Sequence, residues 1–362
     1  MATRTEVGAV PPEQTKSFWG KWFNWIPSWK PTSDAHLENA ERAVLQNISS
    51  EYKDSFVQTG DGHYVRTLSM EPDTQPHPPG KLPLVMLHGF GAGLLQFYKN
   101  FDGLHADRWL HAMDLPGFAR SSRVPFTPDA EAAEGEYVEL IEKWREGMGL
   151  DRFILLGHSF GAFLACSYAM KYPSRVRHLV LVDPWGFSIK PAIEGADRGL
   201  PLLISTFATR FNPLSPIRAV GPFGPSLMAR IRPDLTNIFG EPFMNYVYHC
   251  NAQEPSGETA FFHMQIPIGW AKRPMLERIG TQLDPLVPIT MVYGLRSWMD
   301  SSAGQKVNDL RPFSYVSLYH VRRAGHHVHA DQPEEFNDIL KEVYSVVDSD
   351  QDRTSVDQST LP

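Results

Sequence analysis

One stretch constrains the fold more than any other, residues 152–162, which read Arg-Phe-Ile-Leu-Leu-Gly-His-Ser-Phe-Gly-Ala. A short apolar run, 153–156, leads directly into Gly-His-Ser-Phe-Gly, and residues 160–172 then have a helical pattern. Strand, Gly-x-Ser-x-Gly and helix in this order place a serine hydroxyl on a tight turn at the edge of a sheet. The two glycines fit because side chains there would collide with neighbouring backbone. The pattern predicts that Ser159 is a catalytic nucleophile; the alternative is a buried serine in a glycine-rich turn.

A second glycine-rich stretch follows an earlier strand-like segment. Residues 82–87 form a continuous apolar run of the kind found in buried parallel strands, and residues 88–93 read His-Gly-Phe-Gly-Ala-Gly. In proteins with such a serine turn, a loop of this kind and the residue after the serine each supply a backbone N–H that binds the oxyanion. We therefore expect the oxyanion hole to consist of Phe90 and Phe160, with Gly91 as a substitute donor. The alternative is that the loop is only a sharp turn.

Strand-like runs alternate with helical patterns along much of the chain. We expect helices at 34–49, 131–147 and 334–347, and a hairpin over 52–70 that turns at 60–62. Further strands are expected at 82–87, 109–113, 153–156, 178–183, 287–293 and 314–321. This alternation predicts the α/β class, with a mostly parallel sheet and helices on both faces.

The alternation breaks between residues 184 and 278, which are rich in Pro, Gly, Phe and Met. We interpret this segment as an inserted cap that binds an acyl chain and excludes water; additional core is an alternative that does not exclude a cap. The predicted organisation is a disordered segment with an anchor at 1–33, a core in two parts at 34–183 and 279–347, the cap at 184–278, and a disordered tail at 348–362.

The remaining catalytic groups are predicted from chain order, because serine, acid and histidine follow one another in proteins with this turn. Asp300 lies beyond the strand that follows the insertion, and His326 lies in the loop after the last strand. Asp284 precedes its strand and is a poor candidate. We expect His326 to accept the proton of Ser159 and Asp300 to orient the imidazole.

The loop with His326 also contains His327 and His329. We predict no metal site here, because the spacing lacks the helix with acid and histidine that such sites use. His326 and Asp331 form an H-x4-D spacing, which is associated with glycerolipid acyltransferases. The local interpretation, which we favour, is that Asp331 caps the last helix, with Glu334 three residues further on.

Near the N-terminus, four of the nine tryptophans lie within eleven positions: Trp19, Trp22, Trp25 and Trp29. On a helix they would share one face with Phe18, Phe23 and Ile26, and the segment between Gln14 and Ser33 has three lysines and no acid. Tryptophan favours the membrane interface, so we predict a short anchor that lies on a lipid surface and ends at Pro27. The alternative is an arm whose aromatic rings pack into the protein itself.

Composition narrows the function classes. The formal net charge of −7 gives no indication of nucleic-acid binding. Cys166 and Cys250 are the only cysteines, so a reducing compartment is expected and a disulfide framework is not. The sequence has no apolar run of the roughly 20 residues that cross a bilayer, and its first residues lack the apolar core of a signal peptide. Together these features predict a cytoplasmic protein.

Several motifs resemble one subfamily, the α/β-hydrolase-domain four and five proteins, which are lipid enzymes and lipase co-activators. The resemblance runs from the tryptophan segment to about residue 348. It is carried by the residues at 83–91 (PLVMLHGFG), 154–161 (ILLGHSFG), 183–187 (DPWGF), 248–251 (YHCN), 255–261 (PSGETAF), 269–275 (GWAKRPM) and 325–333 (GHHVHADQP).

The resemblance implies a peripheral protein of lipid droplets or the endoplasmic reticulum. One branch of the subfamily hydrolyses N-acyl phospholipids and lysophospholipids. The other acts as a lysophosphatidic acid acyltransferase, for which acyl-CoA is a co-substrate, and partners a triacylglycerol lipase and droplet coat proteins. In vertebrates that second branch carries Asn where this chain has Ser159. The serine turn resembles the hydrolase branch and residues 267–278 the co-activator branch, and Ala162 stands where the subfamily usually has glycine.

We therefore expect a serine-dependent acyl hydrolase or acyltransferase of glycerophospholipids or lysophospholipids, without a bound cofactor. The first rival is a scaffold that binds lipid and activates a separate triacylglycerol lipase. An intact set of catalytic groups argues against a pure scaffold, because only chemistry requires them together. The second rival, a soluble hydrolase of small esters, is disfavoured by the tryptophan segment.

Overall fold

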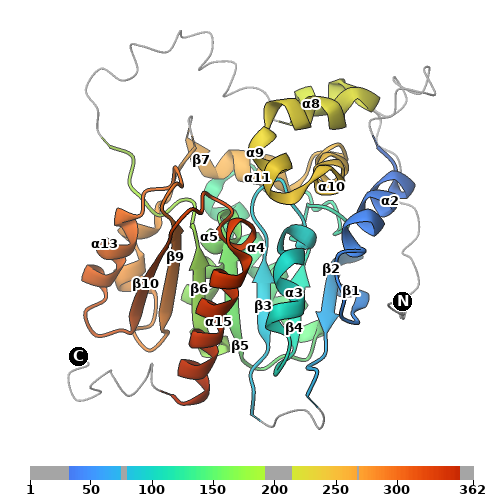
Figure 1. Ribbon diagram of the computed structural model, residues 1–362. Helices are drawn as coiled ribbons and strands as arrows, with labels where there is room; N and C mark the ends of the chain where they lie inside the picture. The colour runs from blue at the N-terminus through green and yellow to red at the C-terminus, as the bar shows by residue number, and fades with distance from the viewer. Residues whose placement is uncertain (1–31, 75–79, 192–213, 267–268, 351–362) are drawn as a thin grey trace.

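The computed structural model describes residues 32–74, 80–191, 214–266 and 269–350 of the 362-residue chain. A sheet of eight strands runs through the molecule in the order β1-β2-β4-β3-β5-β6-β9-β10 (Figure 1). Its strands are β1 (Lys53–Gly60), β2 (His63–Met70), β3 (Leu84–Leu87), β4 (Leu110–Met113), β5 (Phe153–His158), β6 (Val176–Val182), β9 (Ile289–Gly294) and β10 (Val316–Val321). β2 is antiparallel to both neighbours, and all other pairs are parallel. The predicted mostly parallel sheet is confirmed.

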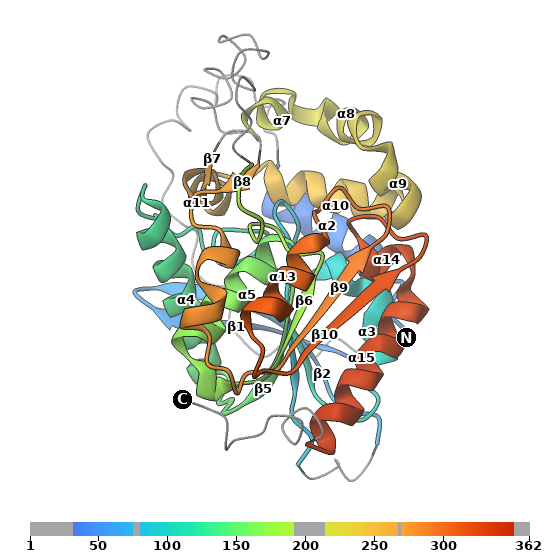
Figure 2. The same ribbon diagram turned by 90° about the vertical axis from the view of Figure 1, so that its left-hand side faces the viewer.

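Helices cover both faces of this sheet, as the two perpendicular views show (Figures 1 and 2). On one side lie α4 (Ala130–Gly147) and α5 (Phe160–Lys171), and on the other α3 (Tyr98–Leu104) and α15 (Pro333–Asp348). Within β3, Val85 and Leu87 join the apolar cluster beneath α4 and α5, whereas Leu84 and Met86 join the cluster beneath α3 and α15. Successive side chains of a strand point to opposite faces, so one apolar strand contributes to two cores.

Local sequence signals set the start of several elements. Helix α2 (Asp34–Leu45) begins after Ser33, whose hydroxyl accepts a hydrogen bond from the His36 amide at 3.3 Å. Helix α4 begins after Asp129, whose carboxylate accepts from two amides of the first turn at 3.0 and 2.9 Å. The predicted hairpin is present, and its turn residues 60–62 all have positive φ. The expected helix at 34–49 ends at Leu45, four residues early.

The start of the last helix differs from the prediction. A one-turn helix, α14 (Val328–Asp331), precedes α15, and the residue at the N-cap position of α15 is Gln332. The Asp331 carboxylate accepts a hydrogen bond from the Gly325 amide at 2.7 Å. The prediction that Asp331 caps the last helix is therefore wrong, because its side chain braces the preceding loop instead.

Between β6 and β9, the described residues 183–191, 214–266 and 269–288 form mostly short helices. They are α7 (Ser215–Ala219), α8 (Gly224–Ile231), α9 (Pro233–Phe239), α10 (Glu241–Asn251), α11 (Gly257–Met264) and α12 (Ile279–Gln282), with the small hairpin β7 (Gln265–Ile266) and β8 (Trp270–Ala271). Helices α8 to α11 lie past the carboxyl ends of the parallel strands (Figure 1). The two ends of the segment meet where the Met275 amide donates to the Gly186 carbonyl at 2.9 Å. Residues 184 and 278 remain the predicted boundaries of a cap.

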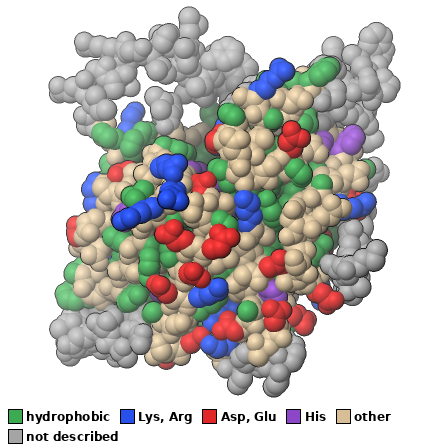
Figure 3. Space-filling view, in the orientation of Figure 1, with side chains coloured by type: hydrophobic (Ala, Val, Ile, Leu, Met, Phe, Trp, Pro, Cys, Tyr) green, Lys and Arg blue, Asp and Glu red, His purple; other side chains and the backbone are tan. Residues whose placement is uncertain are grey.

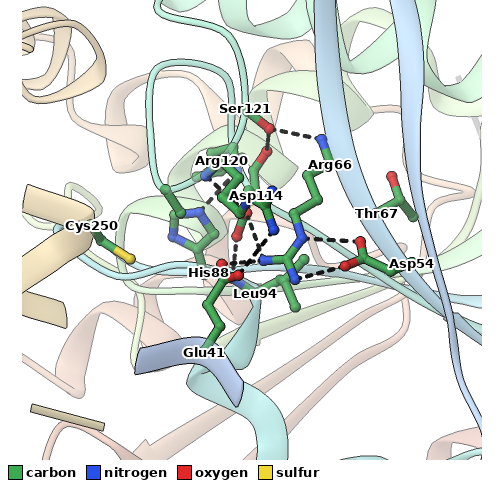
Figure 4. Close-up of polar contacts among 12 residues, drawn as sticks. Glu41, Asp54, Arg66, Thr67, His88, Leu94, Asp114, Arg120, Ser121 and Cys250 are labelled. Carbon is green, nitrogen blue, oxygen red and sulfur yellow. Dashed lines mark hydrogen bonds and ion pairs between the residues drawn. The ribbon is translucent and has the colours of Figure 1, made fainter. Parts of the chain in front are cut away.

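A buried polar cluster ties the N-terminal helix to the sheet (Figure 4). Arg66 of β2 lies within 2.5 Å of Glu41 of α2, 3.0 Å of Asp54 of β1 and 3.5 Å of Asp114, which follows β4. Asp114 also accepts a hydrogen bond from the Leu94 amide at 2.7 Å. Because Leu94 directly follows the glycine-rich loop at 88–93, the cluster holds the end of that loop in place.

Two predicted features lie outside the described residues: the tryptophan anchor and nearly all of the C-terminal tail. None of the helices in the described ranges has both the length and the apolar character that crossing a membrane requires.

Cys166 and Cys250 are both buried and unbridged. On the face shown in Figure 3, acidic and basic side chains are interspersed over the lower half.

Candidate active site

The serine turn has the geometry that the sequence predicts. Ser159 lies between β5 and α5 with φ 53° and ψ −115°, a conformation that residues with a side chain rarely adopt. A Cβ at Gly157 would overlap the backbone of Gly161, and one at Gly161 would overlap the carbonyl oxygens of Leu87 and His88. The two glycines therefore let the turn pack tightly and bring α5 against the end of β3.

The glycine-rich loop lies directly beside this serine. A Cβ at Gly89 would fall 2.7 Å from His158 Nδ1 and 3.3 Å from Ser159 Cβ. In the described part of the chain, the backbone N–H groups of Phe90 and Phe160 donate no hydrogen bond. Phe160 is the first residue of α5, so its amide belongs to the positive end of the helix. Both predicted oxyanion donors are thus free to bind a ligand oxygen.

His326 follows β10, and the carboxylate of Asp183 holds its ring. His326 Nδ1 lies 2.6 Å from Asp183 Oδ2. Asp183 directly follows β6, is completely buried, and has a φ of 43°. Its carboxylate also accepts hydrogen bonds from the Ser297 hydroxyl and from the Gly294 amide, the latter at 3.3 Å. Ser159 and Asp183, both in strained conformations, thus stand at the ends of two neighbouring parallel strands.

The prediction that Asp300 pairs with His326 is wrong. Asp300 is exposed, and its carboxylate accepts from the Ser188 hydroxyl at 2.8 Å and from the Ser302 amide at 3.0 Å. Burial acts to raise the pKa of Asp300, but the hydrogen bonds from Ser302 and Ser188 leave it below its usual value. The carboxylate that lies beside the His326 imidazole is that of Asp183.

Chain order could not decide which of Asp183 and Asp300 pairs with His326. Both acids lie between Ser159 and His326 in the chain, and they follow adjacent parallel strands, β6 and β9, whose carboxyl ends lie side by side. One sequence signal would have favoured Asp183. It follows an uninterrupted apolar strand without a spacer, so its carboxylate is buried where the strand ends. Asp300 lies six residues beyond the last residue of β9, Gly294, in a loop that also contains exposed residues.

Two further residues of the site, Gln96 and His158, were not predicted. The His158 ring bonds the His326 carbonyl through Nε2 at 2.9 Å, and its Nδ1 lies 2.6 Å from Gln96 Nε2. Gln96 Oε1 accepts from the Gly89 amide at 2.9 Å. Since a carbonyl only accepts, His158 carries its proton on Nε2 and accepts from the Gln96 amide at Nδ1. The chain Gly89–Gln96–His158–His326 thus links the glycine-rich loop to the histidine loop.

Burial keeps the surrounding imidazoles neutral. It lowers the pKa of His158 well below its usual value, and the neighbouring His326, His329 and His327 lower it further. Burial likewise lowers the pKa of His329 to about 3. Neutral rings can donate and accept at once, which the chain of hydrogen bonds through His158 requires. No three His, Cys, Asp or Glu side chains in the described ranges are arranged to hold a metal ion.

Ser159 and His326 line one cavity of about 620 Å³, which lies between the carboxyl ends of the parallel strands and helices α8 to α11. Its apolar lining residues are Phe90, Trp185, Leu214, Ile217, Met228, Leu235, Phe243, Val247, Phe261 and Trp298. The serine hydroxyl and the imidazole share the cavity without a hydrogen bond between them in the structure, which is common before substrate binds. An apolar cavity with a serine at its base suits a long acyl chain.

Comparison with known proteins agrees with this geometry. Residues 83–333 match the model of the alpha/beta hydrolase fold family. The chain belongs to this family. It is 47% identical to the human 1-acylglycerol-3-phosphate O-acyltransferase ABHD5 over 88% of its own length and 92% of that protein. It is 46% identical to the human (lyso)-N-acylphosphatidylethanolamine lipase over 88% of its length and 94% of the relative. The subfamily resemblance predicted from the motifs is confirmed.

Solved structures show the same fold at low sequence identity. A carboxylesterase from Bacillus subtilis aligns with a TM-score of 0.64 at 18% identity, covering 85% of this chain and 96% of the other. A bacterial membrane phospholipase A aligns with a TM-score of 0.60 at 19% identity, covering 91% of this chain and 96% of the other. These likenesses support the α/β-hydrolase fold.

Proposed function

We propose that this protein is a serine-dependent acyl hydrolase or acyltransferase of glycerophospholipids and lysophospholipids. The observation that carries the proposal is the Asp183–His326 pair beside Ser159 in an apolar cavity. The names of the human relatives, an acyltransferase of 1-acylglycerol-3-phosphate and a lipase of N-acylphosphatidylethanolamine, support a lipid substrate.

In the proposed reaction, the Ser159 oxygen attacks the acyl carbonyl while His326 accepts the hydroxyl proton at Nε2. Asp183 holds Nδ1 and stabilises the imidazolium that forms. The Phe90 and Phe160 amides bind the oxyanion, each contributing about 3 kcal/mol to the transition state. The ester C–O bond breaks, and His326 returns the proton to the leaving alkoxide. Water or a lysolipid hydroxyl then takes the acyl group from Ser159 by the reverse sequence. In the transfer reaction the donor is acyl-CoA, so the bond that breaks in the first step is the thioester C–S bond, and His326 returns the proton to the CoA thiolate.

The test is turnover of a lipid panel by wild type, Ser159→Ala and a matched control, Ser167→Ala. Ser167 is a buried serine of α5 whose hydroxyl bonds the Phe163 carbonyl away from the cavity. The panel contains N-acylphosphatidylethanolamine, lysophosphatidylethanolamine, lysophosphatidic acid with acyl-CoA, and triacylglycerol. Turnover that Ser159→Ala loses and Ser167→Ala keeps is the expected result. If wild type and Ser159→Ala are equally inactive, yet both stimulate an added triacylglycerol lipase, the protein is a co-activator.

We also propose that the protein is peripheral on lipid droplets or the endoplasmic reticulum, through Trp19, Trp22, Trp25 and Trp29. The support is the aromatic, lysine-bearing sequence before Ser33. Thr32, the first described residue, lies beside α10, since its Oγ1 is 3.0 Å from His249 Nδ1. Flotation with phospholipid vesicles tests this. Substituting alanine for Trp22 and Trp25 should release the protein, whereas Phe313→Ala, at an exposed aromatic residue, should leave binding unchanged.

A further inference from the structure

The cavity at Ser159 has two charged lining residues besides its histidines. Among the described residues these are Arg232 and Asp234, whereas Gln96, Asn251 and Gln265 are uncharged polar lining residues. Arg232 lies at the junction of α8 and α9, and Asp234 lies in the first turn of α9. Most other lining side chains are apolar, so this junction is where a charged portion of a ligand would be stable.

The guanidinium of Arg232 is held in a fixed orientation. Its Nε and Nη2 donate to the two carboxylate oxygens of Asp234 at 2.9 and 2.7 Å. Its Nη1 donates to no described residue, and 44% of the side chain is exposed. Arg232 is therefore oriented by one carboxylate and still has donors for a second anion.

His327 lines the same cavity. Its Nδ1 is buried and has no hydrogen-bond partner among the described residues, which leaves Nε2 as the ring nitrogen that a ligand can reach. Burial lowers the pKa of His327 well below its usual value, and the neighbouring His326, His329 and Arg232 lower it further. A neutral imidazole can donate one hydrogen bond, so the Nε2–H group can bind a ligand oxygen.

We propose that Arg232, assisted by His327, binds the phosphate of the lipid substrate while the acyl chain lies on the apolar wall. This rests on the proposed function and adds a specificity-determining residue: Arg232 would distinguish glycerolipids that carry a phosphate from those that do not. Asp234 takes Nε and one N–H of Nη2, and Nη1 and the second N–H of Nη2 remain as parallel donors that can bind two phosphate oxygens. The names of both human relatives describe substrates that contain such a phosphate.

The test compares lysophosphatidic acid with the monoacylglycerol of the same acyl chain, both in neutral detergent micelles. Arg232→Gln should lower the ratio of the two kcat/KM values at least tenfold, since a charge-assisted hydrogen bond is lost. Arg230→Gln, at the end of α8 two residues before Arg232 but outside the cavity lining, should keep the wild-type ratio. A fall below tenfold in Arg232→Gln, or an equal fall in Arg230→Gln, would overturn the proposal. If the glutamine variant does not fold, Arg232→Lys replaces it, with a fall of at least threefold expected because Lys lacks the fork.

A binding measurement separates this proposal from the proposed function. In the Ser159→Ala background, calorimetry compares an ether-linked lysophosphatidic acid with its phosphate-free alkylglycerol. The phosphate-bearing ligand should bind at least tenfold more tightly, and Arg232→Gln should remove that preference. No preference, or a preference that survives in Arg232→Gln, contradicts the phosphate site whether or not the protein turns over lipid. Absence of Ser159-dependent turnover contradicts only the proposed function.

Discussion

His326 Nδ1 lies 2.6 Å from Asp183 Oδ2, although the two residues are 143 positions apart in the chain. The contact forms because the sheet places the carboxyl end of β6 near the loop after β10, with β9 between the two strands. Asp183 is completely buried and receives further hydrogen bonds from Gly294 and Ser297, so its carboxylate cannot turn away from the imidazole.

Replacing Asp183 should therefore abolish most of the catalysis. In Asp183→Asn the imidazole loses its anionic partner and its preferred tautomer, and kcat should fall by about 10⁴-fold. The matched control is Asp300→Asn, at the acid that bonds Ser188 and Ser302; its kcat should stay within about threefold of wild type. Steady-state kinetics on the best substrate of the panel measures both. A larger loss in Asp300→Asn than in Asp183→Asn would restore Asp300 as the catalytic acid.

Much of the fold was accessible from the sequence. The apolar runs at 82–87, 109–113 and 178–183 each contain most of a strand, because buried parallel strands are continuously apolar. The serine turn was predictable because its glycines are required by backbone packing. The helices between residues 214 and 266 were not individually predictable. They are short, several have proline among their first two residues, and apolar residues from them line a cavity.

The parts of the site that escaped prediction depend on long-range pairing. Gln96 acts through His158, 62 positions away, and a glutamine in an apolar stretch carries no local sign of that partner. Asp331 precedes Pro333 and Glu334, a pattern that also fits a helix cap. Only the fold shows that its carboxylate instead accepts a hydrogen bond from the Gly325 amide. Similarly, Arg66 meets acids from three separate segments.

A second prediction concerns Gln96, which links the Gly89 amide to His158. Gln96→Met keeps the length of the side chain but leaves the Gly89 amide and His158 Nδ1 without partners. We expect kcat to fall about 10- to 100-fold with KM little changed, because a small misplacement of the catalytic loops can cost on the order of 100-fold in rate. Steady-state kinetics separates kcat from KM. A change in KM alone would show that Gln96 contacts substrate and does not position the loops.

The close approach of α5 to β3 provides a third prediction. Gly161→Ala should destabilise the protein by about 3 kcal/mol or more, because the new methyl group overlaps backbone oxygens that cannot move aside. Gly135→Ala is the control. Gly135 is also a helical glycine but has open space around it, so alanine should stabilise the protein by up to about 1 kcal/mol. Urea unfolding measures both; equal effects would show that the packing at the turn is adaptable.

A fourth prediction concerns the polar cluster under the glycine-rich loop. Arg66→Met leaves Glu41, Asp54 and Asp114 buried without their shared cation and should cost about 3–5 kcal/mol. Arg42→Met, at an exposed arginine on α2 that pairs with Glu38, should change stability by less than about 1 kcal/mol. Thermal or urea unfolding of the two variants provides the comparison. If Arg66→Met lost no more stability than Arg42→Met, the buried acids would have to be protonated in the variant.

A fifth prediction is a dependence of stability on pH. Burial lowers the pKa of His111, which faces Ser69, to about 4, whereas an unfolded histidine titrates near 6.5. Between these values the unfolded chain binds a proton that the folded chain does not. His111 therefore contributes stability above about pH 6.5 that is lost on acidification towards about pH 4, amounting to ~3 kcal/mol.

The variant His111→Gln isolates that contribution. Urea unfolding of wild type and variant at several pH values should show a shallower loss of stability in the variant, with the difference confined to the range from about 6.5 down to 4. Parallel curves for the two proteins over this range would mean that folding does not lower the pKa of His111.

The central claim is that Ser159 carries the acyl group, and trapping that intermediate tests it most directly. Wild type, Ser159→Ala and Asp183→Asn would be quenched in acid during turnover of the best lipid substrate, digested, and analysed by mass spectrometry. The account predicts an acyl group on the peptide that contains Ser159 in wild type, none in Ser159→Ala, and much slower acylation in Asp183→Asn. Turnover by wild type with no acylated Ser159 peptide, or with the acyl group on another residue, would contradict it.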